Sequence, residues 1–154
     1  MNYYYFGASL PGLRMETEPP MSYRAFRAEC RRFLHSRDLE GLDALDGSLA
    51  EPSAHPFVAA WRCAETRLRN AVARQRCAAR KEDAGPHMRE VPGIDLRVER
   101  TVSDAFGEAD PLRRQRRLDE FRWKVLEELA GPTVFTGDAI LAYGLKLQLK
   151  PVNA

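Results

Sequence analysis

The chain has 154 residues, of which 44% are hydrophobic and 30% are charged, and its formal net charge is +2. This length suits a single domain with a real core, and the apolar content excludes a disordered polar chain. The near-neutral charge balance excludes a strong overall attraction to nucleic acid. The sequence has no unbroken apolar run of about 18 residues, so it predicts no membrane span. We expect one helical domain over residues 1–154, with loops near 11–20, 47–55 and 84–96.

Three cysteines, Cys30, Cys63 and Cys77, stand far apart in the sequence and form no CxxC motif. Cys63 and Cys77 fall in one predicted helix, where their separation of about 21 Å is too long for a disulfide. Free thiols of this kind are typical of a reducing compartment. The apolar N-terminus lacks a basic leader, which makes it a poor signal peptide. We therefore predict a cytoplasmic protein, peripheral on the cytoplasmic face of the membrane at most.

The first predicted element is a tyrosine-rich apolar run over residues 2–10. The run is too short for periodicity to decide between a helix and an extended segment. We expect the aromatic side chains from Tyr3 to Phe6 to lie in the core, because aromatic residues bury large areas. After a proline-rich loop, Ser22 is a typical N-cap for a helix over residues 23–35, and Ser36 can cap a short second helix.

The clearest helix covers about residues 56–82. Its apolar stripe recurs at spacings of three and four and consists of Phe57, Trp61, Ala64, Leu68, Val72 and Gln75. Arginines flank the stripe and are candidate partner-binding residues: Arg67, Arg69, Arg74, Arg76 and Arg80. The alternatives are solvation, pairing with acidic side chains of neighbouring helices, and contact with nucleic-acid phosphates.

The last third of the chain predicts a short helix around residues 99–107 and two longer ones. Asp110 can cap a long helix that begins at a proline and runs to about residue 130. A Gly-Pro pair ends this helix, and Thr136 or Asp138 begins the last one, whose alternating leucines leave a strand-like tail open. The predicted fold class is all-α, a small bundle of about five helices, with a short extended N-terminal segment left open.

Reaction chemistry is not visible in the sequence. None of His35, His55 and His87 has a second metal ligand three or four residues away, so we expect surface or capping histidines. The acidic pairs lie on amphipathic helices and suit solvated faces or intrachain arginine partners: Asp43 and Asp46, Asp119 and Glu120, Glu127 and Glu128. Motifs of nucleotide-binding, hydrolytic and metal-dependent enzymes are absent. We predict no enzyme and no catalytic, cofactor-binding or metal-binding residue.

Arg122 and Trp123 form an unusual pair inside the wide apolar arc of the long helix. A guanidinium in such an arc needs a carboxylate, backbone carbonyls or an aromatic face, unless it reaches water along the helix surface. We therefore assign Arg122 and Trp123 structural roles, with a buried ion pair as the alternative to solvent exposure for Arg122.

Four segments together suggest a family. They are NYYYFGASLPGL (2–13), LRNAVARQRCAARKED (68–83), ADPLRRQRRLDEFRWKVLEEL (109–129) and VFTGDAILAYGLKLQL (134–149). In this order they resemble an uncharacterised bacterial family encoded in V/A-type ATPase operons. That family is distantly similar to the C subunit of these rotary ATPases, called subunit d in eukaryotes. The C subunit is an all-helical cap that couples the central stalk to the rotor ring. It is longer than this chain, which could supply one of its bundles at most.

The resemblance implies a non-catalytic accessory or central-stalk-associated subunit that acts by protein docking. Its partners would be stalk or rotor subunits, and it would need no cofactor and no small-molecule substrate. One alternative is an arginine-rich helical module that binds nucleic acid, with affinity that falls steeply as salt rises. The other is an enzyme whose site is assembled between helices.

Overall fold

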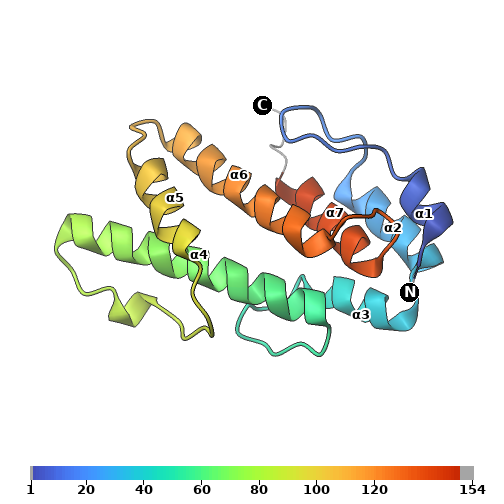
Figure 1. The fold of residues 1–154 in the computed structure, drawn as a ribbon, viewed down its shortest axis with the longest axis horizontal. Coiled ribbons are helices and arrows are strands. Elements are labelled where there is room, and N and C mark those ends of the chain that lie inside the picture. The colour runs from blue at the N-terminus through green and yellow to red at the C-terminus, as the bar shows by residue number, and fades with distance from the viewer. Residues whose placement is uncertain (1, 150–154) are drawn as a thin grey trace. The chain divides into compact units, whose positions relative to one another are not determined.

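The computed structural model describes residues 2–149, which form seven α-helices and no β-strand (Figure 1). The α-helices are α1 (Tyr4–Ser9), α2 (Tyr23–Phe33), α3 (Ser36–Ala44), α4 (Pro56–Arg80), α5 (Leu96–Phe106), α6 (Pro111–Ala130) and α7 (Gly137–Leu149). A short 3₁₀ helix, η1, covers Gly85–His87. The all-α prediction is confirmed, whereas the expected number of about five helices is too low.

The chain divides into two compact units whose boundaries fall inside α4 and α6. Within the described residues, the first unit extends to Ala60 and resumes at Trp123, and the second is Trp61–Arg122. The expectation of a single domain stays a prediction. Among residues 2–149 no helix combines the length and the apolar character that a membrane crossing requires.

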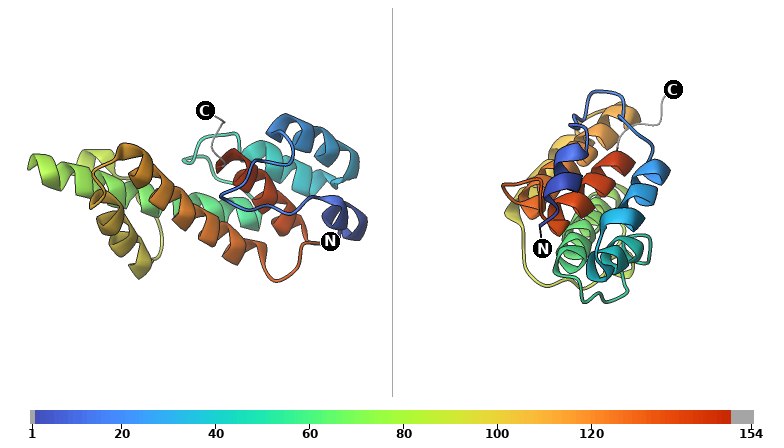
Figure 2. Two further views of the ribbon diagram at one scale, coloured as in Figure 1. Left: turned by 90° about the horizontal axis from the view of Figure 1, so that it is seen from above. Right: turned by 90° about the vertical axis from the view of Figure 1, so that its right-hand side faces the viewer.

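The first unit is organised around α7. Both α2 and α3 pack against it, and Figure 2 shows α7, in red, beside the blue and cyan helices of the same unit. Phe26 of α2 is fully buried and stacks on Tyr143 of α7, with ring centroids 5.4 Å apart. Gly144 makes this approach possible, because a Cβ at that position would lie 2.7 Å from the Phe26 ring.

The N-terminal run is helical over Tyr4–Ser9, whereas Asn2 forms an isolated antiparallel β-bridge with Thr136. Only part of the run is core. Tyr3 and Phe6 are buried, whereas Tyr4 and Tyr5 are 63% and 76% exposed. The expectation of a buried Tyr3–Phe6 block was therefore wrong for two of its residues. A single helical turn spreads consecutive side chains around the axis, so one short helix cannot bury four in a row.

Three predicted caps agree with the structure, and Asp95 is a fourth cap that the sequence analysis did not predict. Ser22, Asp95, Asp110 and Thr136 each accept a hydrogen bond from a backbone N–H in the first turn that follows. Asp95 starts α5 at Leu96, three residues before the predicted start. Ser36 is not a cap: it is the first residue of α3, and His35 is the cap residue, without a side-chain cap bond.

Two helix ends also have local causes. The helix α4 stops at Arg80, and Lys81 then adopts a positive φ of 58°. The helix α6 stops before Gly131, whose φ of 80° suits a residue without a side chain. The last helix continues to Leu149, so the strand-like alternative is excluded up to that residue. The end of the predicted tail lies outside the described residues.

The second unit has a small core of its own. Val98, Val102 and Ala105 of α5 are buried, as are Leu68 and Ala71 of α4. The apolar stripe predicted for α4 includes buried and half-buried positions, in agreement with a helix packed on one side.

Candidate functional site

One candidate site is a cavity of about 480 Å³ within the first unit. Its walls come from the loop after α1, the C-terminal end of α6 with the turn that follows, and one face of α7. The volume falls within the range of about 300–1,000 Å³ that is typical of small-molecule sites. The charged and aromatic lining residues are Trp123, Glu127, Tyr143 and Lys146.

Helical spacing brings these side chains to the cavity. Trp123 and Glu127 are four residues apart on α6, and Tyr143 and Lys146 are three apart on α7. Side chains at these spacings lie on the same face of a helix. Two amphipathic helices thus each contribute one aromatic and one charged residue to the same wall.

Lys146 is the most unusual charged group of the cavity. It is half-buried, and its Nζ atom lies 5.0 Å from the centroid of the Trp123 ring, which is a cation–π geometry. Burial lowers the pKa of Lys146, and the nearby negative charge of Glu127 acts in the opposite direction. Among the described residues, no oxygen accepts a hydrogen bond from this ammonium group. Its donors therefore remain available to a ligand or to water.

Tyr143 fixes one wall of the cavity. Its hydroxyl donates a hydrogen bond of 2.7 Å to the carbonyl oxygen of Pro11. Burial raises the pKa of Tyr143 to about 12, so the phenol is protonated at neutral pH. The loop after α1 is thereby tied to α7, and it forms a defined edge of the cavity.

A second cluster, formed by Tyr3, Asp38 and His55, is buried in the same unit. The Asp38 carboxylate accepts hydrogen bonds from the Tyr3 hydroxyl at 2.5 Å and from His55 Nε2 at 2.8 Å. The other ring nitrogen of His55, Nδ1, accepts a bond of 3.2 Å from the backbone N–H of Phe57. This pattern requires a neutral imidazole with its proton on Nε2.

The ionisation of this cluster follows from its contacts. Burial by itself would raise the pKa of Asp38, but the hydrogen bonds from Tyr3 and His55 outweigh it, and the pKa lies below its ordinary value. Burial and the bond to Asp38 raise the pKa of Tyr3 to about 12. A buried carboxylate with two donors is a stable arrangement at neutral pH.

The cluster is a structural element. Asp38, His55 and Tyr3 are each 5% exposed, and both nitrogens of the His55 ring are already engaged. The Nδ1 lone pair is engaged by the Phe57 N–H, so the imidazole has no free lone pair with which to take a proton from a substrate. For His55 the expectation of a surface side chain was therefore wrong, and the capping role was right, because its Nδ1 bonds to the first turn of α4.

Arg122 is largely buried and forms an ion-pair network in the second unit. Its guanidinium donates two bonds to Glu65, of 3.0 and 2.9 Å, and one of 2.8 Å to Asp119. Burial by itself would lower the pKa of Arg122, but the bonds to these carboxylates raise it. Of the two alternatives for Arg122, the structure adopts the buried pair. Trp123 is buried beside the cavity of the first unit.

The arginines of α4 have different surroundings. Arg67 donates a bond of 2.6 Å to the carbonyl of Pro92, Arg69 pairs with Glu65 at 3.1 Å, and Arg74 pairs with Glu99. Arg76 and Arg80 are exposed, and neither has an ion-pair partner among the described residues. The intrachain alternative thus accounts for the first three, and the last two remain available for a partner.

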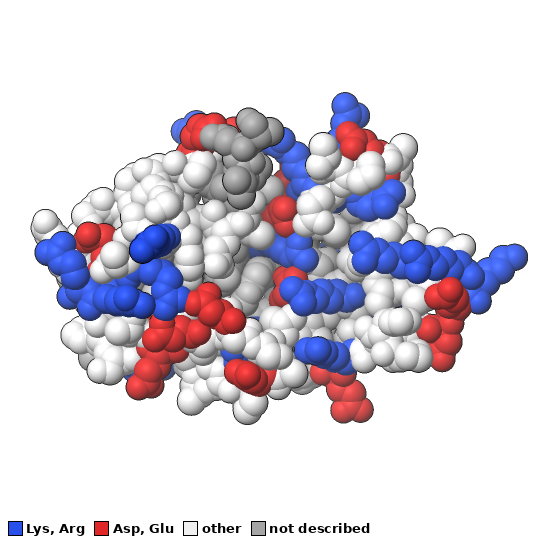
Figure 3. Space-filling view, turned by 180° about the vertical axis from the view of Figure 1, so that it is seen from behind, with Lys and Arg blue, Asp and Glu red and all other residues white. Residues whose placement is uncertain are grey.

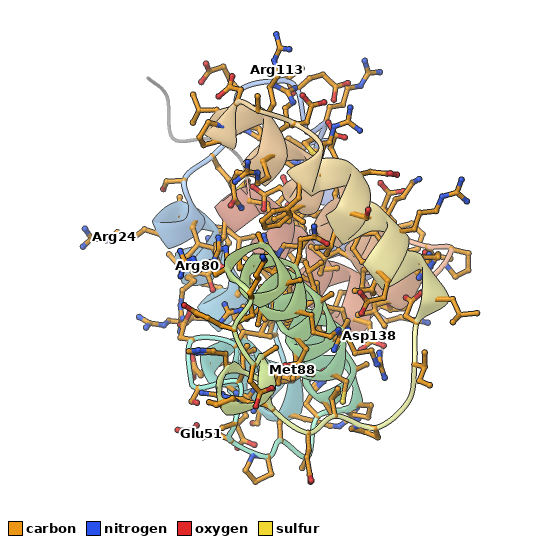
Figure 4. The ribbon with its side chains drawn as sticks, turned by 90° about the vertical axis from the view of Figure 1, so that its left-hand side faces the viewer. Arg24, Glu51, Arg80, Met88, Arg113 and Asp138 are labelled. Carbon is orange, nitrogen blue, oxygen red and sulfur yellow. The ribbon has the colours of Figure 1, made fainter. Side chains whose placement is uncertain are left out.

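Charges of both signs lie close together on one face of the molecule, where Figure 3 shows Lys and Arg side chains next to Asp and Glu. At the start of α6, Arg117 pairs with Glu108 at 2.6 Å, and Arg114 lies over the ring of Phe106. These contacts offset the cost of positive charge at a helix N-terminus. Arg24 and Arg113, by contrast, project away from the ribbon (Figure 4).

Two of the acidic pairs have arginine partners within the chain. Arg27 pairs with both Asp43 and Asp46. The cysteines are free thiols, and burial raises the pKa of Cys30 to about 12. Within residues 2–149, no three His, Cys, Asp or Glu side chains gather as metal ligands would.

The sequence analysis missed both the cavity and the Asp38 cluster. Each joins segments that are far apart in the sequence, and no local motif marks them. The one available signal for the cavity was Lys146, a charged residue within the apolar pattern of the last helix. Comparison with protein-family models, curated proteins and solved structures finds no match to this chain.

Proposed function

We propose that this protein is a non-catalytic accessory or central-stalk-associated subunit of a V/A-type ATPase, which acts by docking to a protein partner. The observation that carries the proposal is the order of the four sequence segments that resemble the ATPase-associated family. Each segment contains part or all of an α-helix, namely α1, α4, α6 and α7 in turn. An all-helical chain is compatible with a bundle related to the C subunit.

The docking surface that we propose lies at the C-terminal end of α4. Arg76 and Arg80 are exposed there and have no intrachain carboxylate among the described residues. The partner surface would be acidic, because an arginine fork matches carboxylates in a bidentate geometry. Arg67 and Arg74 would hold the neighbouring segments in place. With Arg69, which is paired within α4, they would contribute less to the partner directly. The protein would act on the cytoplasmic side, with the membrane contacted at most peripherally.

Affinity purification of the tagged protein from its native organism tests the proposal. We expect stalk or rotor subunits to co-purify with the wild-type protein. The double variant R76E/R80E should lose them, because it reverses the charge of the proposed surface. The matched control is R24E, which changes an exposed arginine of the first unit (Figure 4). Repeated absence of ATPase subunits from the wild-type purification would overturn the proposal.

Nucleic-acid binding is the competing function. An arginine-rich module would bind DNA or RNA at low salt, and its affinity would fall steeply as salt rises. The structure leaves fewer arginines available to contact phosphates than the sequence suggested, because three of them already have partners within the chain: Arg67, Arg69 and Arg74. A gel-shift titration at low salt decides between the two: tight, salt-sensitive binding that R76E/R80E abolishes would favour the nucleic-acid module.

A further inference from the structure

We propose that the cavity beside Lys146 and Trp123 binds a small organic monocarboxylate with an apolar or aromatic body. This role goes beyond docking through α4 and does not depend on it. The ligand would be bound without chemical change, so it would be an effector or stabiliser.

The ammonium group of Lys146 provides the site for the carboxylate. It lies at the cavity wall, half-buried, with its Nζ atom 5.0 Å from the Trp123 ring centroid. An ammonium has three donors, and among the described residues no oxygen accepts from Lys146. A partly desolvated cation with free donors favours an anionic oxygen, and charge-assisted bonds of this type are stronger than neutral ones.

The remaining walls suit an apolar body. They include Leu10, Leu13 and Val134 as well as the indole of Trp123. Val134 is 58% exposed, which leaves apolar surface for a ligand to cover. A flat aromatic group would pack against the part of the indole that lines the cavity, as aromatic pairs do in protein cores. The cavity volume of about 480 Å³ is enough for a compact ligand of this kind.

Glu127 limits the charge of the ligand. It lines the same cavity, and its negative charge acts on Lys146. A second carboxylate on the ligand would meet this charge at short range, which is unfavourable. The site should therefore prefer a monocarboxylate to a dicarboxylate, and it should bind the monocarboxylate more tightly when Glu127 is neutral.

The test compares three probes of one shape by isothermal titration and saturation-transfer NMR: 4-phenylbutyrate, its neutral amide, and 4-phenylbutylamine. We expect the acid to bind about tenfold more tightly than the amide, since it adds one charge-assisted bond. The amine should bind least. The variant K146M should reduce the affinity for the acid to that of the amide and leave the amide unchanged. K146R, which keeps the charge, should retain part of the preference.

Two further variants complete the design. K124M removes an exposed lysine of α6 that does not line the cavity, and it should change nothing. E127Q should raise the affinity for the acid several-fold. Circular dichroism must show that K146M melts at the same temperature as the wild type. If K146M is destabilised, the binding of the three probes to the wild-type protein and to E127Q tests the proposal instead. The proposal would be overturned if the acid and the amide bound equally well. It would also be overturned if no probe bound at about 10 mM, a concentration that matches a very weak site.

Discussion

His55 Nε2 lies 2.8 Å from Asp38 Oδ1, and this buried contact connects the start of α4 to α3. The second oxygen of Asp38 accepts the Tyr3 hydroxyl, so one carboxylate holds three segments of the first unit together. The backbone at Gly137 also approaches this carboxylate so closely that it leaves no room for a side chain, because a Cβ there would lie 2.5 Å from Asp38 Oδ2. The carboxylate therefore sits where the N-terminus, α3, α4 and α7 converge.

Replacing Asp38 should destabilise the protein strongly. Asp38→Ala leaves the Tyr3 hydroxyl and the His55 N–H buried without an acceptor, and each unsatisfied donor costs about 1–3 kcal/mol. We expect a loss of about 3 kcal/mol or more in the free energy of unfolding, measured by urea denaturation. Asp43→Ala is the matched control on the same helix: its carboxylate is exposed, and we expect a loss of less than about 1 kcal/mol. Equal losses in the two variants would contradict the structural role of the cluster.

Asp38 should also make stability depend on acid pH. Its pKa is lower in the folded protein than the ordinary value of 3.8, so its contribution is fully present above that value. The contribution is lost as the pH falls through the folded pKa, because the unfolded state then binds more protons. Urea denaturation from pH 6 to pH 2 should show a shallower acid decline for Asp38→Asn than for the wild type. Parallel acid declines would show that Asp38 titrates alike in both states.

The helices and the buried polar contacts differ in how far the sequence predicts them. Helix starts such as Ser22 and Asp110 were predictable, because a cap residue acts on the first turn that follows it in the chain. His55 was not, because its burial depends on Asp38, which is 17 residues earlier and belongs to another helix. Lys146 likewise acquires its setting only when α6 and α7 lie together. Local sequence patterns therefore predict the helices. The pairing of polar residues that are distant in the sequence can be seen only once the three-dimensional fold is known.

Arg122 and Glu65 should be strongly coupled in stability. Glu65→Ala removes the main partner of a largely buried guanidinium and leaves Asp119 as its remaining carboxylate among the described residues. The variant should therefore cost about 3 kcal/mol, the low end for a broken buried pair. The double variant Glu65→Met with Arg122→Met removes both charges and should recover much of that loss. A double-mutant cycle with the two single variants, followed by urea denaturation, measures the coupling. Additive losses would show that the pair contributes no interaction of its own.

Gly144 should be intolerant of even one methyl group. A Cβ at this position would lie 2.7 Å from the Phe26 ring, and Phe26 is fully buried, so the ring has little room to move. Gly144→Ala should therefore cost about 1–3 kcal/mol through overpacking, although alanine favours the helix that it occupies. Gly12→Ala is the control, because a Cβ there would meet nothing within 4 Å. Thermal denaturation should show a clear drop in melting temperature for Gly144→Ala and almost none for Gly12→Ala. If Gly144→Ala were instead more stable than the wild type, α2 and α7 would have to separate enough to admit the methyl group.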